Sequence, residues 1–223
     1  VKNKKIISFI AYTSLVIGLL IISIISVSTS INILILVAAC CFLGYLYQGP
    51  PFRFGYQGLG EPLCWLAFGP FAYSAVLIAL NPSNIYFEDI PWKVSLLLGS
   101  GPSLATTLVL FCSHFHQISE DKKHGKNSPL VRLGAKKGSQ FVPWIIFTIY
   151  IFQLFTIVYG FIPVFCILYL LSFPQAIRLI NLLKSSYAKP SAIKNCKFVA
   201  IKFQTLNGVG LITGLIFNYL LNK

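Results

Sequence analysis

IISFIAYTSLVIGLLIISII, residues 6–25, is the stretch that decides the fold. It carries no charge, and its length matches the roughly 20 residues that an α-helix needs to cross the hydrocarbon core of a bilayer. Six further runs that are mostly apolar follow it along the chain, at residues 31–47, 62–80, 92–113, 141–158, 161–183 and 203–221. The sequence therefore predicts an all-α, polytopic transmembrane bundle of seven helices.

The overall composition supports a membrane protein. Hydrophobic residues make up 56% of the 223 residues and charged residues only 10%, and the mean hydropathy is +0.77. These values lie outside the range of soluble globular domains. We find no internal repeat, no low-complexity tail and no composition shift that would mark a soluble domain. Residues 1–223 are expected to form a single transmembrane domain.

The positive charge is sorted by topology. The chain has a net charge of +13, and in the seven-helix arrangement all of its cations except Lys93 and Lys223 fall on one side. Short segments rich in Lys and Arg stay on the inner face of a membrane, so this side is the inside. Because the cations follow the topology and form no single binding face, nucleic acid is not an expected partner. The long inside connections are residues 48–61, 114–140 and 184–202.

The first polar segment is YLYQGPPFRFGYQGLGEP, residues 45–62. Its glycines permit tight turns and close backbone approach, and Arg53 and Glu61 are rare charges at the membrane border. One interpretation is a helix-breaking connection with an arginine that reaches the interface. The other is a substrate site, in which the Arg53 guanidinium holds a phosphate and Tyr47, Tyr56 and Glu61 line the pocket.

The second polar segment is FCSHFHQISEDKKHGKNSPLVRLG, residues 111–134, which contains all three histidines of the chain. If residues 112–122 continue the preceding helix, His114, Gln117 and Asp121 fall on one face. Mg²⁺ prefers oxygen ligands, which makes Asp121 and the side-chain carbonyl of Gln117 candidate ligands. His114 is a candidate contact for a diphosphate or a second substrate.

Two simpler interpretations apply to the second segment. The inside-positive rule by itself explains its cations, although it leaves the acids and histidines unexplained. A zinc site is not expected, because His114 and His116 would diverge on a helix and no cysteine or further histidine completes a ligand set. The six cysteines of the chain show no metal or redox spacing and are interpreted as small apolar residues.

These two segments also carry a family resemblance. The chain resembles the UbiA-type superfamily of membrane prenyltransferases, within it the branch that prenylates 1,4-dihydroxy-2-naphthoate. Gln117 stands where this branch has the first aspartate of its second aspartate-rich motif. The residues that match the two motifs of the branch are Tyr47, Pro51, Tyr56, Gly58, Gly60 and Glu61 in the first segment, and Asp121, Gly125, Lys126 and Val131–Gly134 in the second.

The resemblance implies a fold of nine helices, of which this chain would supply helices three to nine. The absent pair would carry the first aspartate-rich motif, which holds half of the family's magnesium site. The chain begins with Val1 and contains no Met, which indicates an incomplete reading frame or an unusual start codon. Because residues 1–5, VKNKK, stand where an inside loop is expected, we expect the chain to be N-terminally incomplete.

The resemblance further implies an enzyme, a transferase of prenyl groups. It would attach a prenyl group, phytyl in the subgroup that this chain is similar to, to 1,4-dihydroxy-2-naphthoate, with loss of CO₂ and diphosphate, in phylloquinone or menaquinone biosynthesis. The implied cofactor is Mg²⁺, and the implied partners are the prenyl diphosphate, the naphthoate and membrane lipid. The expected catalytic residues are Asp121, Lys126 and Arg53, the metal ligands Asp121 and Gln117, and the substrate contacts Tyr47, Tyr56, Glu61, His114 and Arg132.

Two alternatives stay open at this point. Another aromatic acceptor, such as homogentisate, 4-hydroxybenzoate or haem, would keep the fold and change the reaction. A non-catalytic basic multi-span protein would require polar residues within the spans, and these are sparse. The abundance of Ile, Lys, Asn and Ser suggests an AT-rich genome, so we expect a plastid membrane, thylakoid or envelope, with a bacterial inner membrane as the alternative.

Overall fold

The computed structural model describes residues 4–81 and 86–223, and every regular element within these ranges is helical. Seven helical segments there are long and apolar enough to cross a membrane, as the sequence predicts. They are Lys5–Ser28, Ile31–Gln48, Gly60–Leu80, Trp92–His116, Pro129–Val158, Val164–Ser186 and Ser191–Leu221. The all-α, seven-span prediction is confirmed, and the protein is a multi-pass membrane protein.

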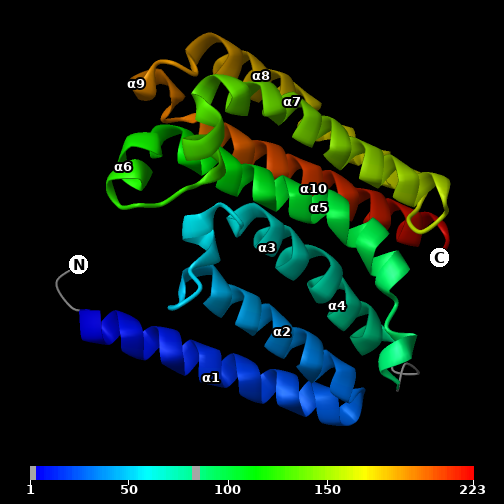
Figure 1. The fold of residues 1–223 in the computed structure, drawn as a ribbon. Helices are drawn as coiled ribbons and strands as arrows, with labels where there is room; N and C mark the ends of the chain where they lie inside the picture. The colour runs from blue at the N-terminus through cyan, green and yellow to red at the C-terminus, as the bar shows by residue number, and fades with distance from the viewer. Residues whose placement is uncertain (1–3, 82–85) are drawn as a thin grey trace.

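The helices form a bundle of roughly aligned rods (Figure 1). The elements of the first half are α1 (Lys4–Ser28), α2 (Ile31–Gln48), η1 (Phe54–Gln57), α3 (Gly60–Leu66), η2 (Ala67–Phe71), α4 (Ala72–Leu80) and η3 (Phe87–Asp89). Those of the second half are α5 (Trp92–Ser113), η4 (His114–His116), α6 (Ile118–Lys123), α7 (Pro129–Val158), η5 (Val164–Ser172), α8 (Phe173–Ser186), α9 (Pro190–Ile193) and α10 (Cys196–Leu221).

The loops are sorted between the two ends of the bundle. The beginning of α1, the connection that contains η1, α6 and α9 all lie at one end (Figure 1). The α1–α2 turn, the α7–η5 connection and the C-terminus lie at the other end. This arrangement agrees with the alternation that the cations predict, and it places both polar segments on the same, cation-rich side.

Three helices differ from the predicted spans in length or continuity. The helix α7 begins at Pro129, well before the expected residue 141, and it bends at Gly134, where φ is 78°. Its first turns carry Lys136 and Lys137, so a search for apolar runs misses them. The third span is interrupted at η2, a π-helical turn that contains Pro70, since proline cannot donate the backbone hydrogen bond of a regular helix. The predicted inside connection 184–202 contains α9 and the start of α10.

The core lies around α5, α7, α8 and α10. Leu108, Val142, Leu179 and Phe203 are fully buried there and pack in one apolar cluster. By contrast, α1 sits at the edge of the bundle, and only 6% of the residues in its most apolar window are buried, against 50% for the segment that contains α5. The side chains of α1 therefore suit contact with lipid, whereas α5 is the central support for the polar segment that follows it.

Candidate active site

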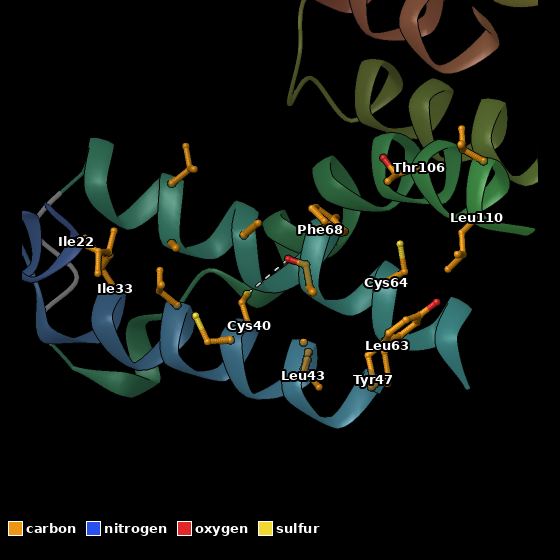
Figure 2. Close-up of a pocket in the computed structure, with 18 of the residues that line it drawn as sticks. Ile22, Ile33, Cys40, Leu43, Tyr47, Leu63, Cys64, Phe68, Thr106 and Leu110 are labelled. Carbon is orange, nitrogen blue, oxygen red and sulfur yellow. Dashed lines mark hydrogen bonds between the residues drawn. The ribbon is translucent and has the colours of Figure 1, made fainter. Parts of the chain in front are cut away.

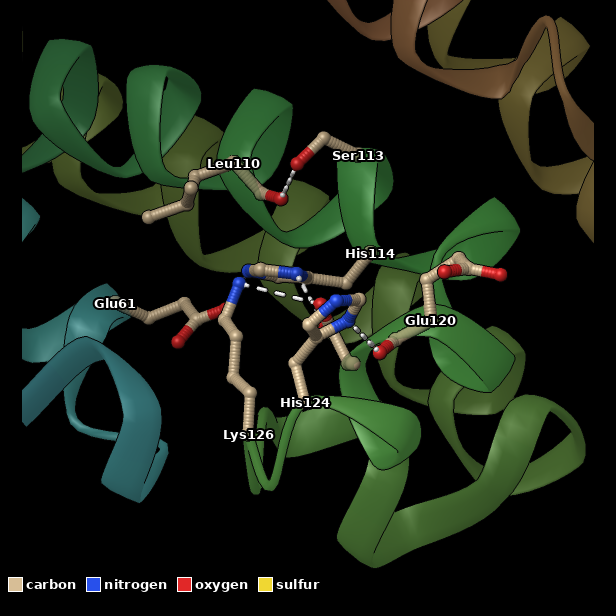
Figure 3. A network of polar contacts seen from close by, with 8 residues as sticks. Glu61, Leu110, Ser113, His114, Glu120, His124 and Lys126 are labelled. Atoms are coloured by element: carbon tan, nitrogen blue, oxygen red, sulfur yellow. Dashed lines mark hydrogen bonds and ion pairs between the residues drawn. The ribbon is translucent and has the colours of Figure 1, made fainter.

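A buried cluster of acidic and basic side chains lies at the inside end of α5 (Figure 3). His114 Nε2 lies 3.7 Å from Glu61 Oε1, and His114 Nδ1 lies 3.3 Å from Asp121 Oδ2. Lys126 Nζ lies 3.5 Å from Asp121 Oδ1. We call this set the acid–base cluster, and its members are Glu61, His114, Asp121 and Lys126. It joins both polar segments of the sequence.

The local fold of the second segment explains how Asp121 and Lys126 meet. The helix α5 ends at Ser113, whose hydroxyl donates to the Leu110 carbonyl at 2.6 Å, and a 3₁₀ turn follows. After α6, Gly125 takes a φ of +67°, a conformation that glycine adopts without steric cost. The backbone N–H of Lys126 then donates to the Asp121 carbonyl at 2.8 Å. This reversal turns the Lys126 side chain back onto the Asp121 carboxylate.

The structure differs here from the continuous helix on which the Gln117 expectation depended. The helix breaks at η4, and Gln117 has a φ of −106°. Its backbone carbonyl accepts from the Asp121 N–H at 2.7 Å. Among the described residues, no hydrogen bond or ion pair joins the Gln117 side chain to the acid–base cluster. His114 and Asp121 meet, but they do so through a turn and not along one helical face.

Several atoms of the cluster are buried without a hydrogen-bond partner. These include both carboxylate oxygens of Glu61, Oδ2 of Asp121 and Nδ1 of His114. The separations between the paired atoms exceed ordinary hydrogen-bond lengths, so Lys126 compensates the charge of Asp121 without a direct hydrogen bond. A buried polar group without a partner carries a desolvation cost of about 1–3 kcal/mol. The cluster is therefore suited to a ligand that supplies positive charge or donors.

The residues of the acid–base cluster fit a magnesium ion only in part. Within residues 4–81 and 86–223, no group of three or more His, Cys, Asp or Glu side chains is arranged to hold a metal. Mg²⁺, however, is commonly bound by one or two carboxylates together with water and substrate phosphates. The unpartnered Asp121 Oδ2 suits such a role. The described chain offers a partial carboxylate site and not a complete protein cage.

Tyr47, near the end of α2, packs against Gly55 and Gly60 of the first polar segment. A Cβ atom on Gly60 would lie 2.8 Å from Tyr47 Cε2, and one on Gly55 would lie 2.9 Å from the Tyr47 carbonyl oxygen. Both contacts are too close for any side chain, so the glycines let the loop fold against the end of α2. Gly60 also begins α3, and this close packing places the neighbouring Glu61 beside His114.

Backbone contacts tie the two polar segments together. The Asn127 N–H donates to the Tyr56 carbonyl at 2.7 Å, and the Arg132 guanidinium donates to the Gln57 carbonyl. Gly58 has a φ of +77°, and a Cβ there would lie 2.6 Å from the Asn127 carbonyl oxygen. The loop that follows Lys126 is therefore attached to η1.

The remaining site residues lie outside the buried cluster. Arg53 is exposed, and its guanidinium carbon lies 5.7 Å from the centre of the Tyr56 ring. Tyr56 is half-buried and Arg132 is exposed. Since Tyr56 and Arg132 belong to the contacts between the loops, Arg53 is on the same side of the bundle as the acid–base cluster. We call these two exposed arginines the cationic rim, and Lys126, whose side chain is 15% exposed, is the partly buried cation.

An apolar cavity of about 1030 Å³ runs between α1–α5 and α10 (Figure 2). Ile22 and Ile33 line one end, and Tyr47, Leu63 and Cys64 line the other (Figure 2). Tyr47 contacts the start of α3, and Ser113 of the cavity wall directly precedes His114. The cavity therefore extends along the bundle and ends beside the acid–base cluster.

Three polar residues of the cavity wall were not predicted from the sequence. The Gln204 side-chain amide donates to the Thr106 hydroxyl at 2.7 Å, and both residues line the cavity. Ser113 is a third polar residue of this wall. The only available signal was that each is a polar residue within or at the end of an apolar span, which does not separate a cavity wall from a helix contact.

The fold and the site together define a class of protein: a helical membrane protein in which an apolar cavity ends at a buried acid–base cluster on the cation-rich side. Within this class, the chain belongs to the UbiA prenyltransferase family, whose profile matches residues 3–201. The resemblance found in the two polar segments is thus confirmed over most of the chain.

Two curated relatives are similar to this chain. One is the 2-carboxy-1,4-naphthoquinone phytyltransferase of Synechocystis, 37% identical over 183 residues, which are 82% of this chain and 57% of that protein. The other is the chloroplastic 2-carboxy-1,4-naphthoquinone phytyltransferase of Arabidopsis thaliana, 37% identical over 191 residues, which are 85% of this chain and 50% of that protein. The chain thus spans about half the length of these relatives. No solved structure matches it.

Proposed function

We propose that this chain acts in the transfer of a phytyl group from phytyl diphosphate to 1,4-dihydroxy-2-naphthoate, with release of CO₂ and diphosphate, in phylloquinone or menaquinone biosynthesis. The names of the two relatives support this donor and this type of acceptor. The observation that carries the proposal is the junction of the apolar cavity with the acid–base cluster. A long apolar tail and an anionic head require such a pair of environments side by side.

The cavity mainly orients the apolar tail of the prenyl donor and contributes little to the affinity for the donor. Burial of a methylene from water is favourable by about 0.8 kcal/mol, but a phytyl chain in a bilayer is already out of water. Lipid tails are as apolar as the leucines of a helix, so little is gained by exchanging one for the other. Most of the affinity is therefore assigned to the diphosphate at the inside end, with the tail lying along the wall from Tyr47 toward Ile33.

At the diphosphate end, Lys126 and the rim arginines Arg53 and Arg132 supply positive charge to the phosphate oxygens. Asp121 would hold Mg²⁺, with Gln117 as the second predicted ligand, and the ion when bound would supply charge that offsets the diphosphate as it leaves. His114 lies between Glu61 and Asp121 and holds the two carboxylates in place. Stabilisation of the leaving group by such fixed charges is the main contribution expected from the protein.

The acceptor must be electron-rich to react. The relatives are named for the quinone form of the ring, and a quinone is electron-poor, so we assign the reduced dihydroxy form as the nucleophile. The allylic carbon–oxygen bond breaks and its electron pair leaves with diphosphate. The ring carbon that bears the carboxylate forms the new carbon–carbon bond, and the carboxylate departs as CO₂, returning its bonding pair to the ring. The apolar walls of the cavity exclude water, which would otherwise capture the cation.

For location, we propose a plastid membrane, thylakoid or envelope. One relative is chloroplastic and the other is cyanobacterial. Because the second comes from a bacterium, a bacterial inner membrane is the alternative location. The orientation follows the cations, with the acid–base cluster near the inner face of the membrane.

The direct test is a product assay. Membranes that contain this chain are incubated with phytyl diphosphate, Mg²⁺ and one of three acceptors: 1,4-dihydroxy-2-naphthoate, homogentisate or 4-hydroxybenzoate. The expected result is a phytylated naphthoquinol and released CO₂ with the first acceptor, and loss of both products when a chelator removes divalent ions. Product from homogentisate or 4-hydroxybenzoate, with the naphthoate unchanged, would contradict the assigned acceptor and favour another branch of the family.

A further inference from the structure

A second concave site, which shares no lining residue with the acid–base cluster, lies at the inside ends of α8, α9 and α10. It is a groove of about 690 Å³. Arg178, Asn181 and Ser185 line it from one stripe of α8, since residues three, four and seven apart share a helix face. Lys184 and Asn195 line it as well. The groove shares no lining residue with the apolar cavity.

The charge of this groove is not compensated within the described chain. Its two charged residues, Arg178 and Lys184, are both cationic and exposed. Neither takes part in any of the ion pairs among the described residues. The five acids of the chain all belong to other segments. The side chains of Asn181, Ser185 and Asn195 add hydrogen-bond donors to the positive charge.

The position of the groove is interfacial. Along α8, the exposed residue Ile177 lies four positions before Asn181 on the same stripe, in the direction of the membrane. On α10, the exposed Phe198 follows Asn195 by three positions. A cationic groove with exposed apolar side chains on its membrane side matches a molecule with an anionic head and acyl chains.

We infer that this groove binds the phosphate headgroup of an anionic membrane lipid, with the acyl chains against the exposed apolar faces of α8 and α10. Arg178 and Lys184 attract the phosphate, and basic pockets between helices on the inner side are suited to such headgroups. The inside-positive rule explains why cations are present here. It does not explain a concave arrangement in which two cations, two amides and a hydroxyl line one hollow.

Binding in the groove would also support the corner of the bundle that carries the acid–base cluster. The short helix α9 packs against η4, the turn that contains His114, and also against α8. A headgroup held between α8 and Asn195 adds contacts to this corner. The inference does not depend on the proposed reaction, because it uses no residue of the acid–base cluster.

The test compares lipids with equal tails and different heads. The purified chain in neutral detergent is titrated with phosphatidylglycerol or with phosphatidylcholine of the same acyl composition, and bound lipid is measured by native mass spectrometry. Arg178→Gln/Lys184→Gln should weaken phosphatidylglycerol binding by about 30-fold, since each cation near the membrane surface contributes about 1 kcal/mol. Lys136→Gln/Lys137→Gln, which removes two exposed inside cations that do not line the groove, should leave this binding nearly unchanged.

Two further measurements separate headgroup binding from a general effect of charge. Asn181→Asp adds a carboxylate to the groove without removing a cation, and it should also weaken phosphatidylglycerol but not phosphatidylcholine. Inorganic phosphate at the same concentration should not displace the lipid, and thermal unfolding should match between the variants. Equal weakening by the groove and control variants would overturn the inference, as would displacement of the lipid by free phosphate.

Discussion

Asp121 and Lys126 of the second inside polar segment lie in a different environment from Arg53 of the first. In residues 114–128, Asp121 and Lys126 are turned inward and face each other. In residues 48–59, Arg53 is exposed, and its guanidinium group lies against the ring of Tyr56. Residues 114–128 also contribute His114, which reaches across to Glu61 at the start of α3. The cationic and acidic residues that the sequence groups together are thus divided into a buried set and a solvated rim.

This difference decides how much each residue is expected to contribute. A charge in a buried site interacts strongly because water does not screen it, and its geometry is fixed before a ligand arrives. An exposed charge is screened and must be ordered on binding, so its contribution is small. Residues of the acid–base cluster should therefore dominate the reaction, and the rim should assist the capture of the anionic substrate.

The largest effect is expected for Asp121→Asn. The substitution keeps the size of the side chain and removes its negative charge, which is proposed to hold the metal ion and is paired with Lys126. Phytyl transfer should fall by about 100-fold or more, the range found when one electrostatic contribution to a transition state is removed. The measurement is the initial rate of naphthoquinol formation in membranes with equal amounts of protein.

The neighbouring Glu120 provides the matched control. It is exposed, and its carboxylate pairs with Lys123 at 3.0 Å on the surface of α6. Glu120→Gln should leave the rate within about twofold, because exposed pairs contribute only about 0.2–1 kcal/mol. Full activity of Asp121→Asn would remove Asp121 from the metal site, and equal losses in both variants would erase the distinction between buried and exposed acids.

A paired comparison of Lys126→Gln with Arg53→Gln separates the partly buried cation from the rim. Lys126 is proposed to donate a hydrogen bond to the diphosphate. Loss of a hydrogen bond to a charged group costs about 1.5–3 kcal/mol, so Lys126→Gln should lower the rate by about 10- to 100-fold. For the exposed Arg53, the loss should stay below about fivefold and should appear mainly in the KM for phytyl diphosphate. A larger decrease in rate for Arg53→Gln than for Lys126→Gln would mean that the rim arginines, and not Lys126, bind the diphosphate.

The smallest effect concerns the attachment between the two segments. Gly58→Ala places a residue with a Cβ at a φ of +77°, where that Cβ would meet the Asn127 carbonyl oxygen. The left-handed conformation alone costs about 1–2 kcal/mol, which corresponds to a decrease of about 2–8 °C in the thermal midpoint for a chain of this size. Unfolding followed by thiol labelling or light scattering in detergent measures it.

Gly208→Ala is the control for this stability change. Gly208 lies in α10 with no positive φ, and a Cβ added there would meet nothing within 4 Å. Alanine is also the better helix former. The thermal midpoint of this variant should be equal to or higher than that of the unchanged chain. If Gly58→Ala unfolds no earlier than Gly208→Ala, the contact between η1 and Asn127 is not a constraint on the site.

The site could be predicted only in part. The residue types of the site could be predicted, because Glu61, His114 and Asp121 are rare polar residues beside apolar spans. The side of the membrane could be predicted from the cations. The mutual geometry of the three residues could not be predicted. The expected alignment of His114, Gln117 and Asp121 assumed a continuous helix, and the break at η4 changed it. The first turns of α7 were missed because they are amphipathic, and hydropathy detects apolar runs and not helices as such.

The sequence by itself determined the membrane class and the seven spans, and it predicts the orientation. Apolar content and positive charge act locally and additively along the chain, so they can be counted without knowledge of any contact. Only the tertiary structure decided that Glu61 faces His114, that Lys126 returns to Asp121, and that the apolar cavity ends beside them. The contact between Glu61 and His114 joins segments that are distant in the chain, and it forms only when α3 packs against α5. The contact between Lys126 and Asp121 is close in the chain, but it depends on the turn at Gly125.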